Sequence, residues 1–386
     1  MGKKLKIAII VPDNRDEFRS YGDPAPHFGT APTALLDGFS QLANDCEIHV
    51  VCCVQRPLAA PKKIGPNIFY HTEVVRKWGW LRGGYLGCIR SLRRQLRKIQ
   101  PDIVHGQGTE RYCALGAVFS SFPNVVTIHG NMKAIAEFYH ARPGSFHWLT
   151  ARLETLALRR TSGVFCNSTY TELQVAPRNR RIWRVANALR PDFFSPVPDS
   201  KTKAQPVILN VGSAMPYKRQ LELLGVAHRL HQRGIKLEWQ FAGKLDGSTA
   251  YQAALARALA IGEQAGYARQ LGSLSTSQLI AAMDAASALV HFPSEEAFGL
   301  VVAEALARNL KFFGAATGGV VDIATGVDGA ELIPAQDFTH LETAIADWQQ
   351  AGFPQPRNAA QTIRERYHPL VIARRHLEIY REVLGG

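Results

Sequence analysis

Residues 288–308 constrain the fold more than any other stretch of the chain. They begin with an apolar run, residues 288–292, which is typical of a buried parallel strand. Residues 300–308 contain good helix formers and no Gly or Pro, so they predict a helix after a short loop. A strand, a short loop and a helix in this order aim the N-terminus of the helix at a ligand. The stretch therefore predicts an α/β fold with a binding site in this loop.

Two glutamates, Glu296 and Glu304, lie in this strand–loop–helix unit. On one helix they would be about 12 Å apart along the axis, but Gly299 interrupts a continuous helix. We therefore place Glu296 in the loop and Glu304 on the second turn, from which it can reach back to the same pocket. The free backbone N–H groups of residues 298–301 (Phe298, Gly299, Leu300 and Val301) would face an anion. The alternative is that Glu296 caps the helix and Glu304 is a solvated surface residue.

The length and charge of the chain indicate two domains and an anionic partner. A chain of 386 residues is too long for one ordinary core, so two domains are expected. The net charge of +13 belongs to the first half: residues 1–195 carry 27 Lys and Arg against 14 Asp and Glu, whereas the remainder carries 18 against 18. Such an asymmetry indicates a nucleic acid, an anionic membrane surface or an anionic substrate.

The cysteines and the apolar runs indicate a cytosolic protein. None of the six cysteines has the spacing of metal ligands, so we interpret them as reduced, mostly buried thiols. No apolar run approaches the ~20 residues of a membrane-spanning helix, and residues 7–12 are too short for the core of a signal peptide.

Much of the positive charge lies between residues 76 and 98, which carry eight basic residues and no acidic one. Apolar residues from Leu86 to Ile99 fall at helical spacing, and Trp78, Trp80 and Tyr85 lie just before or at the start of this helix. A basic amphipathic helix preceded by tryptophans is typical of a contact with a membrane surface. The alternative is that the apolar stripe packs on a sheet and the arginines are only solvated. Both interpretations can be true at once, because the apolar stripe can pack on the sheet while the charged face meets lipid headgroups.

The first half contains further strands that end in candidate site residues. Residues 6–11 predict the first strand, and the irregular loop of residues 12–32 leads to Gly29 and Thr30 before a helix over residues 33–43. Loops at the carboxyl ends of parallel strands are where ligands bind. His129 follows the predicted strand over residues 125–128, and His105 ends the one before it. No G-x-G-x-x-G follows the first strand, which argues against a dinucleotide site.

The second half repeats the alternation of strands and helices. Residues 191–206 hold four prolines and predict a linker. A strand over residues 207–211 precedes Lys218 and Arg219, and these lead into a helix over residues 220–232. The ammonium group of Lys218 can neutralise a phosphate group. The alternative is that Lys218 is a solvated residue at the start of this helix.

These motifs resemble those of the retaining glycosyltransferases of family 4. Residues 293–306 resemble the family's E-x7-E signature, with Pro-Ser before the first glutamate and Phe-Gly-Leu inside the motif. Residues 127–130, Thr-Ile-His-Gly, resemble an element that points toward the sugars. The loop of Lys218 resembles a Gly-Arg and Lys-Gly pattern, in which Ser213 replaces the usual arginine and Arg219 replaces the glycine.

The resemblance implies the GT-B fold, in which two Rossmann-like doubly wound α/β domains face each other across a cleft. We expect an acceptor-binding domain over residues 1–190, the linker over 191–206 and a nucleotide-sugar-binding domain over 207–368. Residues 369–386 would form a last helix that crosses back onto the first domain.

The implied reaction moves a hexose from a nucleotide diphosphate sugar, first of all UDP-glucose, to a hydroxyl of a glycan or lipid-linked acceptor in envelope or exopolysaccharide synthesis. No metal or other cofactor is expected. The implied catalytic residues are His129, Glu296 and Lys218. The other residues implied to bind substrate are Gly29 and Thr30 near the donor phosphates, Arg219 with Phe298, Gly299 and Leu300 at the diphosphate, Leu274 at the base and Glu304 at the ribose.

Three alternatives stay open. The chain could be a sugar-nucleotide epimerase of the same fold, or a catalytically inactive sugar-nucleotide-binding protein. It could also be a basic protein that binds a membrane or a nucleic acid without catalysis, although no recognised nucleic-acid-binding module is visible. We expect a cytoplasmic protein, alone or peripheral on the inner face of the membrane.

Overall fold

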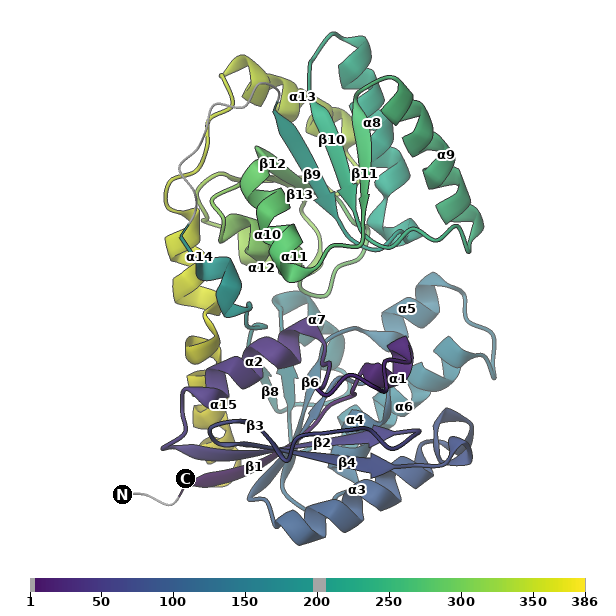
Figure 1. Ribbon diagram of the computed structural model, residues 1–386, viewed down its shortest axis with the longest axis vertical. Helices are drawn as coiled ribbons and strands as arrows, with labels where there is room; N and C mark the ends of the chain where they lie inside the picture. The colour runs from purple at the N-terminus through teal and green to yellow at the C-terminus, as the bar shows by residue number, and fades with distance from the viewer. Residues whose placement is uncertain (1–3, 197–205, 386) are drawn as a thin grey trace. The chain divides into compact units, whose positions relative to one another are not determined.

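The computed structural model describes residues 4–196 and 206–385, which form two compact units (Figure 1). Unit 1 comprises Met1–Arg190 together with Tyr367–Gly386, and unit 2 comprises Pro191–Arg366. Each unit is an α/β sandwich around one mainly parallel sheet. The predicted α/β class with two doubly wound domains is confirmed.

Unit 1 contains an eight-stranded sheet of order β3-β4-β2-β1-β5-β6-β7-β8. All neighbours are parallel except β3 and β4, which are antiparallel. The central strands are buried on both faces, which explains their continuous apolar sequences. The strands are β1 Leu5–Ile10, β2 Cys46–Val54, β3 Lys63–Gly65, β4 Ile68–Val74, β5 Ile103–Gln107, β6 Asn124–Ile128, β7 Val164–Cys166 and β8 Ile182–Arg184.

Helices cover both faces of this sheet. Leu92 of α3, Leu115 of α4 and Leu158 of α6 belong to the core on one face. Phe39 of α2 and Tyr380 of α15 belong to the core on the other face. The helices are α1 Arg15–Phe18, α2 Thr30–Ser40, α3 Leu86–Ile99, α4 Tyr112–Val118, α5 Met132–Phe138, α6 Phe146–Arg160, α7 Thr169–Val175 and α15 Pro369–Val383, with the 3-10 helices η1 Lys77–Gly79 and η2 Leu81–Gly83.

The last helix, α15, packs on α2 within unit 1. Gly38 of α2 permits this packing, because a side chain there would collide with the backbone carbonyl of Pro369. The proline lies at the first position of α15, where it costs no intrahelical hydrogen bond. The C-terminal helix therefore belongs to the body of unit 1.

Unit 2 contains a fully parallel six-stranded sheet of order β11-β10-β9-β12-β13-β14. The strands are β9 Val207–Val211, β10 Glu238–Ala242, β11 Ala268–Gly272, β12 Ala288–His291, β13 Lys311–Ala315 and β14 Ala330–Ile333. The helices are α8 Gln220–Gln232, α9 Ala250–Gln264, α10 Thr276–Ala285, α11 Leu300–Leu306, α12 Gly318–Ala324, α13 Phe338–Gln350 and α14 Ala359–Tyr367, with the 3-10 helices η3 Pro191–Phe194 and η4 Pro216–Lys218.

The predicted linker begins with residues that are packed into unit 2. Phe193 is fully buried, and the guanidinium of Arg308 donates to the carbonyl of Ser195 at 2.6 Å. The same guanidinium forms an ion pair with Asp284 at 2.7 Å. Residues 197–205 of the predicted linker lie outside the described residues.

Candidate active site

Two loops of unit 2 meet where neighbouring strands end. Residues 212–219 follow β9, and residues 292–299 follow β12, its neighbour in the sheet. The backbone N–H of Ser294 donates to the carbonyl of Tyr217 at 2.8 Å and fixes one loop against the other. Because both strands are parallel, both loops lie at the carboxyl edge of the sheet, where α/β proteins bind ligands.

Glu296 is the centre of the polar contacts between these loops. Its Oε2 accepts a hydrogen bond from Nζ of Lys218 at 2.5 Å and another from Nε2 of His291 at 2.8 Å. The exposed fractions of the Lys218 and Glu296 side chains are only 19% and 15%. The structure therefore brings together the two residues of this unit that the sequence implicates in catalysis, and it adds a histidine.

The surroundings of Glu296 keep its carboxylate ionised. Burial by itself raises the pKa of Glu296, but the hydrogen bond from His291 and the charge of Lys218 outweigh it and lower that pKa to about 2. Burial also lowers the pKa of His291, so the imidazole is neutral near pH 7 and its Nε2–H donates to the carboxylate. Two donors at Oε2 hold the carboxylate in one orientation, as a hydrogen-bond acceptor for a bound hydroxyl requires.

Arg219, next to Lys218, has a left-handed backbone with a φ of 55°. This conformation costs a residue other than glycine about 1 kcal/mol or more, and it explains the glycine that the resemblance predicts at this position. The guanidinium lies 5.9 Å from the ring of Phe338. Its Nη1 is buried and has no hydrogen-bond partner among residues 4–196 and 206–385. An anion between the two loops would supply that partner.

The segment after Glu296 has the predicted form. Gly299 has a φ of 97°, which only glycine adopts readily, and it directly precedes α11. Phe298 is buried and Leu300 opens the helix. Glu304 lies on the second turn and is 5% exposed, so it is not the solvated residue of the alternative interpretation.

Gly318 and Gly319, at the start of α12, contact the backbone of Glu296. The N–H of Gly319 donates to the carbonyl of Glu296 at 3.0 Å, and a side chain at Gly318 would collide with the same carbonyl. These glycines therefore let α12 pack against the loop of Glu296, and this packing supports the loop.

Leu274 lies after β11, the edge strand, and is half-buried. It shares the carboxyl edge of the sheet with Lys218 but belongs to a loop two strands away. The predicted contact of Leu274 with the base of the nucleotide stays a prediction.

In unit 1, His129 lies just after β6 and is half-buried. Its Nε2 donates to Oε1 of Gln107, at the end of β5, at 2.8 Å. Burial lowers the pKa of His129 to about 4, and a hydrogen bond with Asn187 offsets this only in part. His129 is therefore a neutral hydrogen-bonding group near pH 7 rather than a cation.

The weaker candidate of unit 1, His105, is a core residue. It is fully buried, and its ring nitrogens contact the hydroxyls of Tyr380 at 2.5 Å and Thr127 at 2.6 Å. Both ring nitrogens are thereby engaged in joining β5 to β6 and α15. Its interpretation as a site residue is wrong, because a histidine inside a buried strand has no access to a ligand.

Gly29 and Thr30 lie at the start of α2, the helix that follows β1. Gly29 is the N-cap residue and no side chain caps the helix there. The helix begins three residues earlier than predicted, because Pro32 is tolerated in the first turn. The structure thus places Gly29 and Thr30 at the carboxyl edge of the sheet of unit 1, the same edge as His129.

Two members of the site had no sequence signal that identified them. His291 ends an apolar strand, and Gln107 lies between two glycines. A single polar residue of either kind is usually a satisfied core residue. Only the tertiary contacts with Glu296 and His129 distinguish them.

Family models match both units of the chain. The model described as Glycosyltransferase Family 4 matches residues 36–193, and the model described as Glycosyl transferases group 1 matches residues 195–366. This chain is a family 4 glycosyltransferase. The E-x7-E resemblance and the enzyme class that it implied are confirmed. A search of curated proteins found no relative.

Several solved structures share the fold of this glycosyltransferase. Sucrose-phosphate synthase from Thermosynechococcus elongatus has a TM-score of 0.78 and 16% identity, and the match covers 99% of this chain and 100% of that one. HepE from Anabaena, in complex with UDP and glucose, has a TM-score of 0.70 and 17% identity over 98% and 100%. The lipopolysaccharide outer core galactosyltransferase WaaB has a TM-score of 0.68 and 17% identity over 98% and 100%. They establish the GT-B fold.

Proposed function

We propose that this glycosyltransferase moves a hexose from a nucleotide diphosphate sugar, with UDP-glucose as the first donor to test, to a hydroxyl of a glycan or lipid-linked acceptor. The configuration at the anomeric carbon would be retained. The observation that carries the proposal is the arrangement of Lys218, Glu296 and His291 at the carboxyl edge of unit 2. The complexes of HepE with UDP-glucose and with UDP and glucose support the choice of donor.

The proposed roles follow from charge and position. Lys218 and the guanidinium of Arg219, whose buried Nη1 has no hydrogen-bond partner among the described residues, would neutralise the charge that develops on the leaving diphosphate, without a metal ion. Both donors to Glu296 address Oε2, so Oε1 would accept a hydrogen bond from a hydroxyl of the donor sugar. Glu304 would accept from the ribose hydroxyls. These roles need no protein nucleophile, in keeping with front-face substitution rather than the two-carboxylate scheme of glycosidases.

Donor binding and turnover are tested together. UDP-glucose, GDP-glucose and ADP-glucose are added to the full-length protein, and thermal unfolding and release of free nucleoside diphosphate are recorded with and without candidate glycan acceptors. One donor at 100 times its Kd should stabilise the folded state by about 2.7 kcal/mol, and release should depend on an acceptor. Conversion of the donor to an epimer without acceptor, or no stabilisation by any of the three, would count against the proposal.

A membrane-facing surface would place the enzyme near a lipid-linked acceptor on the cytoplasmic face of the membrane. In α3, the apolar stripe packs into the core, as one of the two interpretations of this helix expects. Its residues are Ile89, Leu92, Leu96 and Ile99. The outer face carries exposed Arg90, Arg94, Arg97 and Lys98. Trp78, in η1, is 82% exposed. No helix of the described residues is long and apolar enough to span a bilayer, so we propose peripheral binding through this face.

Replacing Arg90, Arg97 and Lys98 with glutamine in one triple variant is expected to lower binding to vesicles that contain anionic lipid by about 100-fold, at ~1 kcal/mol for each cation. Arg93 and Arg94 are left unchanged, because Arg93 donates to Ser121 and Arg94 forms an ion pair with Glu73. Sedimentation with vesicles measures the effect. The matched control replaces Lys236, Arg257 and Arg269, which are exposed cations of unit 2, and should bind normally. Equal binding by both triple variants would refute this surface.

A further inference from the structure

An apolar groove with a volume of about 820 Å³ lies along one face of α2 in unit 1. Thr33, Leu36 and Ser40, which recur at helical spacing, form one wall of the groove. Asp37 of α2 also lines the groove, and the rest of the lining comes from the loops after β1 and β2 and from the hairpin of β3 and β4. None of the donor-binding or catalytic residues named above lines this groove.

The groove extends from the carboxyl edge of the sheet toward its amino edge. The helix α2 begins at the carboxyl edge because it follows β1, and residues 33–40 cover about 10 Å of its length. At the far end, Ile68 lines the groove and pairs with Ile48 near the start of β2. Figure 1 shows α2 and the strands β3 and β4 in the same part of unit 1. The groove thus runs along α2, and Phe28 and Thr33, which flank the start of this helix, line the end at the carboxyl edge.

The chemistry of the lining excludes most classes of ligand. Four prolines contribute to it and offer no backbone N–H donor, so an added peptide strand would find few partners. Among the described residues that line the groove there is no Lys, Arg or His, so the lining offers no cation to an anion. A sugar needs several convergent polar groups. A hydrocarbon chain needs only apolar walls and length, and the groove supplies both.

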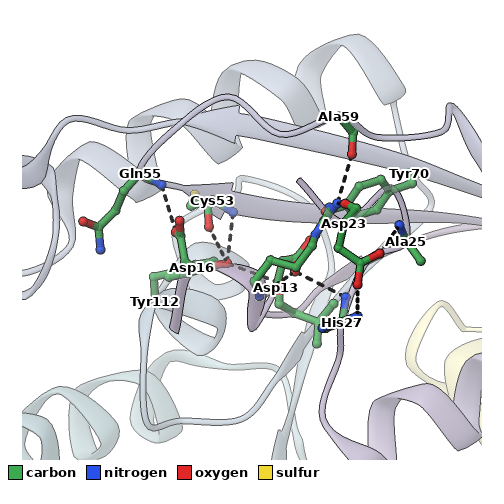
Figure 2. Close-up of polar contacts among 12 residues, drawn as sticks. Asp13, Asp16, Asp23, Ala25, His27, Cys53, Gln55, Ala59, Tyr70 and Tyr112 are labelled. Atoms are coloured by element: carbon green, nitrogen blue, oxygen red, sulfur yellow. Dashed lines mark hydrogen bonds and ion pairs between the residues drawn. The ribbon is translucent and has the colours of Figure 1, made fainter. Parts of the chain in front are cut away.

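A buried ionic network holds two walls of the groove in place. The guanidinium of Arg15 donates to the carbonyls of Asp23 at 2.7 Å and Ala59 at 2.9 Å, which belong to the loops after β1 and β2. Asp13 pairs with Arg15 at 2.7 Å and accepts from the hydroxyl of Tyr70 at 2.5 Å. Figure 2 shows Asp13 and Tyr70 near Asp23 and Ala59, which belong to these two loops. Both charged side chains are fully buried, so the groove is preformed rather than opened by its ligand.

We propose that this groove binds the hydrocarbon chain of a lipid-type acceptor. The inference rests on the proposed transfer function and names the acceptor class for it. The hydrocarbon chain of the acceptor lies along α2, and the polar end of the acceptor emerges at the carboxyl edge beside Gly29 and Thr30. Unit 1 then holds the acceptor by its apolar part and leaves the hydroxyl to be glycosylated in water-accessible space at the edge that carries His129.

The test measures binding of butyl, hexyl and octyl glucoside to the full-length protein by calorimetry. For the wild type, Kd should fall by about fourfold for each added methylene, the value for a buried CH₂. Two substitutions, Thr33→Trp on α2 and Ala60→Trp on the facing loop, fill the groove from opposite sides and should remove this dependence on chain length. The matched control is Thr343→Trp, on the exposed face of α13, and it should bind as the wild type does.

Each outcome decides one of the two proposals. If the dependence on chain length is the same in both groove variants as in the wild type, the groove proposal is wrong. It is also wrong if no alkyl glucoside binds and Thr33→Trp instead abolishes dimers in light scattering, because the occupant is then a second copy of the chain. Retained stabilisation by UDP-glucose in the groove variants shows that they fold. If Kd depends on the length of the alkyl chain but no transfer from a donor is detected, the groove proposal is retained and the proposed function is wrong.

Discussion

Replacing Lys218 with alanine is expected to reduce kcat/KM of the glycosyltransferase by about 100- to 1000-fold. The reason is the loss of a positive charge at the position where the diphosphate leaves, an effect of the size seen when one preorganised stabilising donor is removed. The substitution also deprives Glu296 of one of its two donors. Release of nucleoside diphosphate at saturating and limiting donor separates the loss in kcat from the loss in donor binding.

The matched control for this substitution is Lys236→Ala. Lys236 is exposed and precedes β10, so it lies at the amino edge of the same sheet, opposite to Lys218. Its removal should change kcat/KM by less than twofold, as is usual for a solvated surface charge. A third variant, Lys218→Arg, keeps the charge and should recover part of the rate. If Lys218→Ala and Lys236→Ala have the same kinetics, Lys218 does not act on the leaving group.

Replacing Arg15 with methionine is expected to lower the free energy of unfolding of unit 1 by about 3–5 kcal/mol. The side chain of Arg15 and that of its partner Asp13 are both 0% exposed, so the substitution leaves an unpaired buried carboxylate. Hydrogen–deuterium exchange of the amides of β1 and β4 measures the opening free energy of this region. The exposed pair of Arg111 and Glu17 supplies the control, because Arg111→Met should cost less than about 1 kcal/mol.

The effect of Arg15→Met depends on pH in a defined direction. Burial raises the pKa of Asp13, but the hydrogen bonds from Arg15 and Tyr70 outweigh it and hold that pKa below its usual value. The ion pair therefore stabilises the fold above the pKa of an unfolded aspartate, about 4, and this contribution is lost as the pH falls further. The difference between wild type and variant should accordingly shrink on acidification below pH 4. A difference that is constant with pH would mean that the loss comes from packing alone.

The sequence predicts the regular elements of this enzyme well where each has its own pattern. The helix α8 has the predicted bounds, because it is long and periodic. The helix α4 was not predicted, because all of its residues are buried and it shows no apolar face. The strand β3 has only three residues, too few for any alternation. Short or fully buried elements are defined by their packing rather than by local sequence.

The candidate site divides in the same way. Glu296 and Lys218 could be predicted because each belongs to a motif with a fixed spacing. His291 could not, because its role appears only in the contact with Glu296. The network of Asp13, Arg15 and Tyr70 joins residues up to 57 positions apart, and no local sequence pattern predicts such a contact. Charge alone did not distinguish a buried Arg15 from the solvated arginines of α3.

The most direct test of this account is a crystal structure of the protein with a nucleotide diphosphate sugar bound. We expect the diphosphate to lie between Lys218 and Arg219 and the first turn of α11. The sugar should lie against Glu296, and the ribose against Glu304. A donor molecule bound elsewhere, with Lys218 still paired to Glu296 and neither glutamate in contact with it, would contradict the central claim.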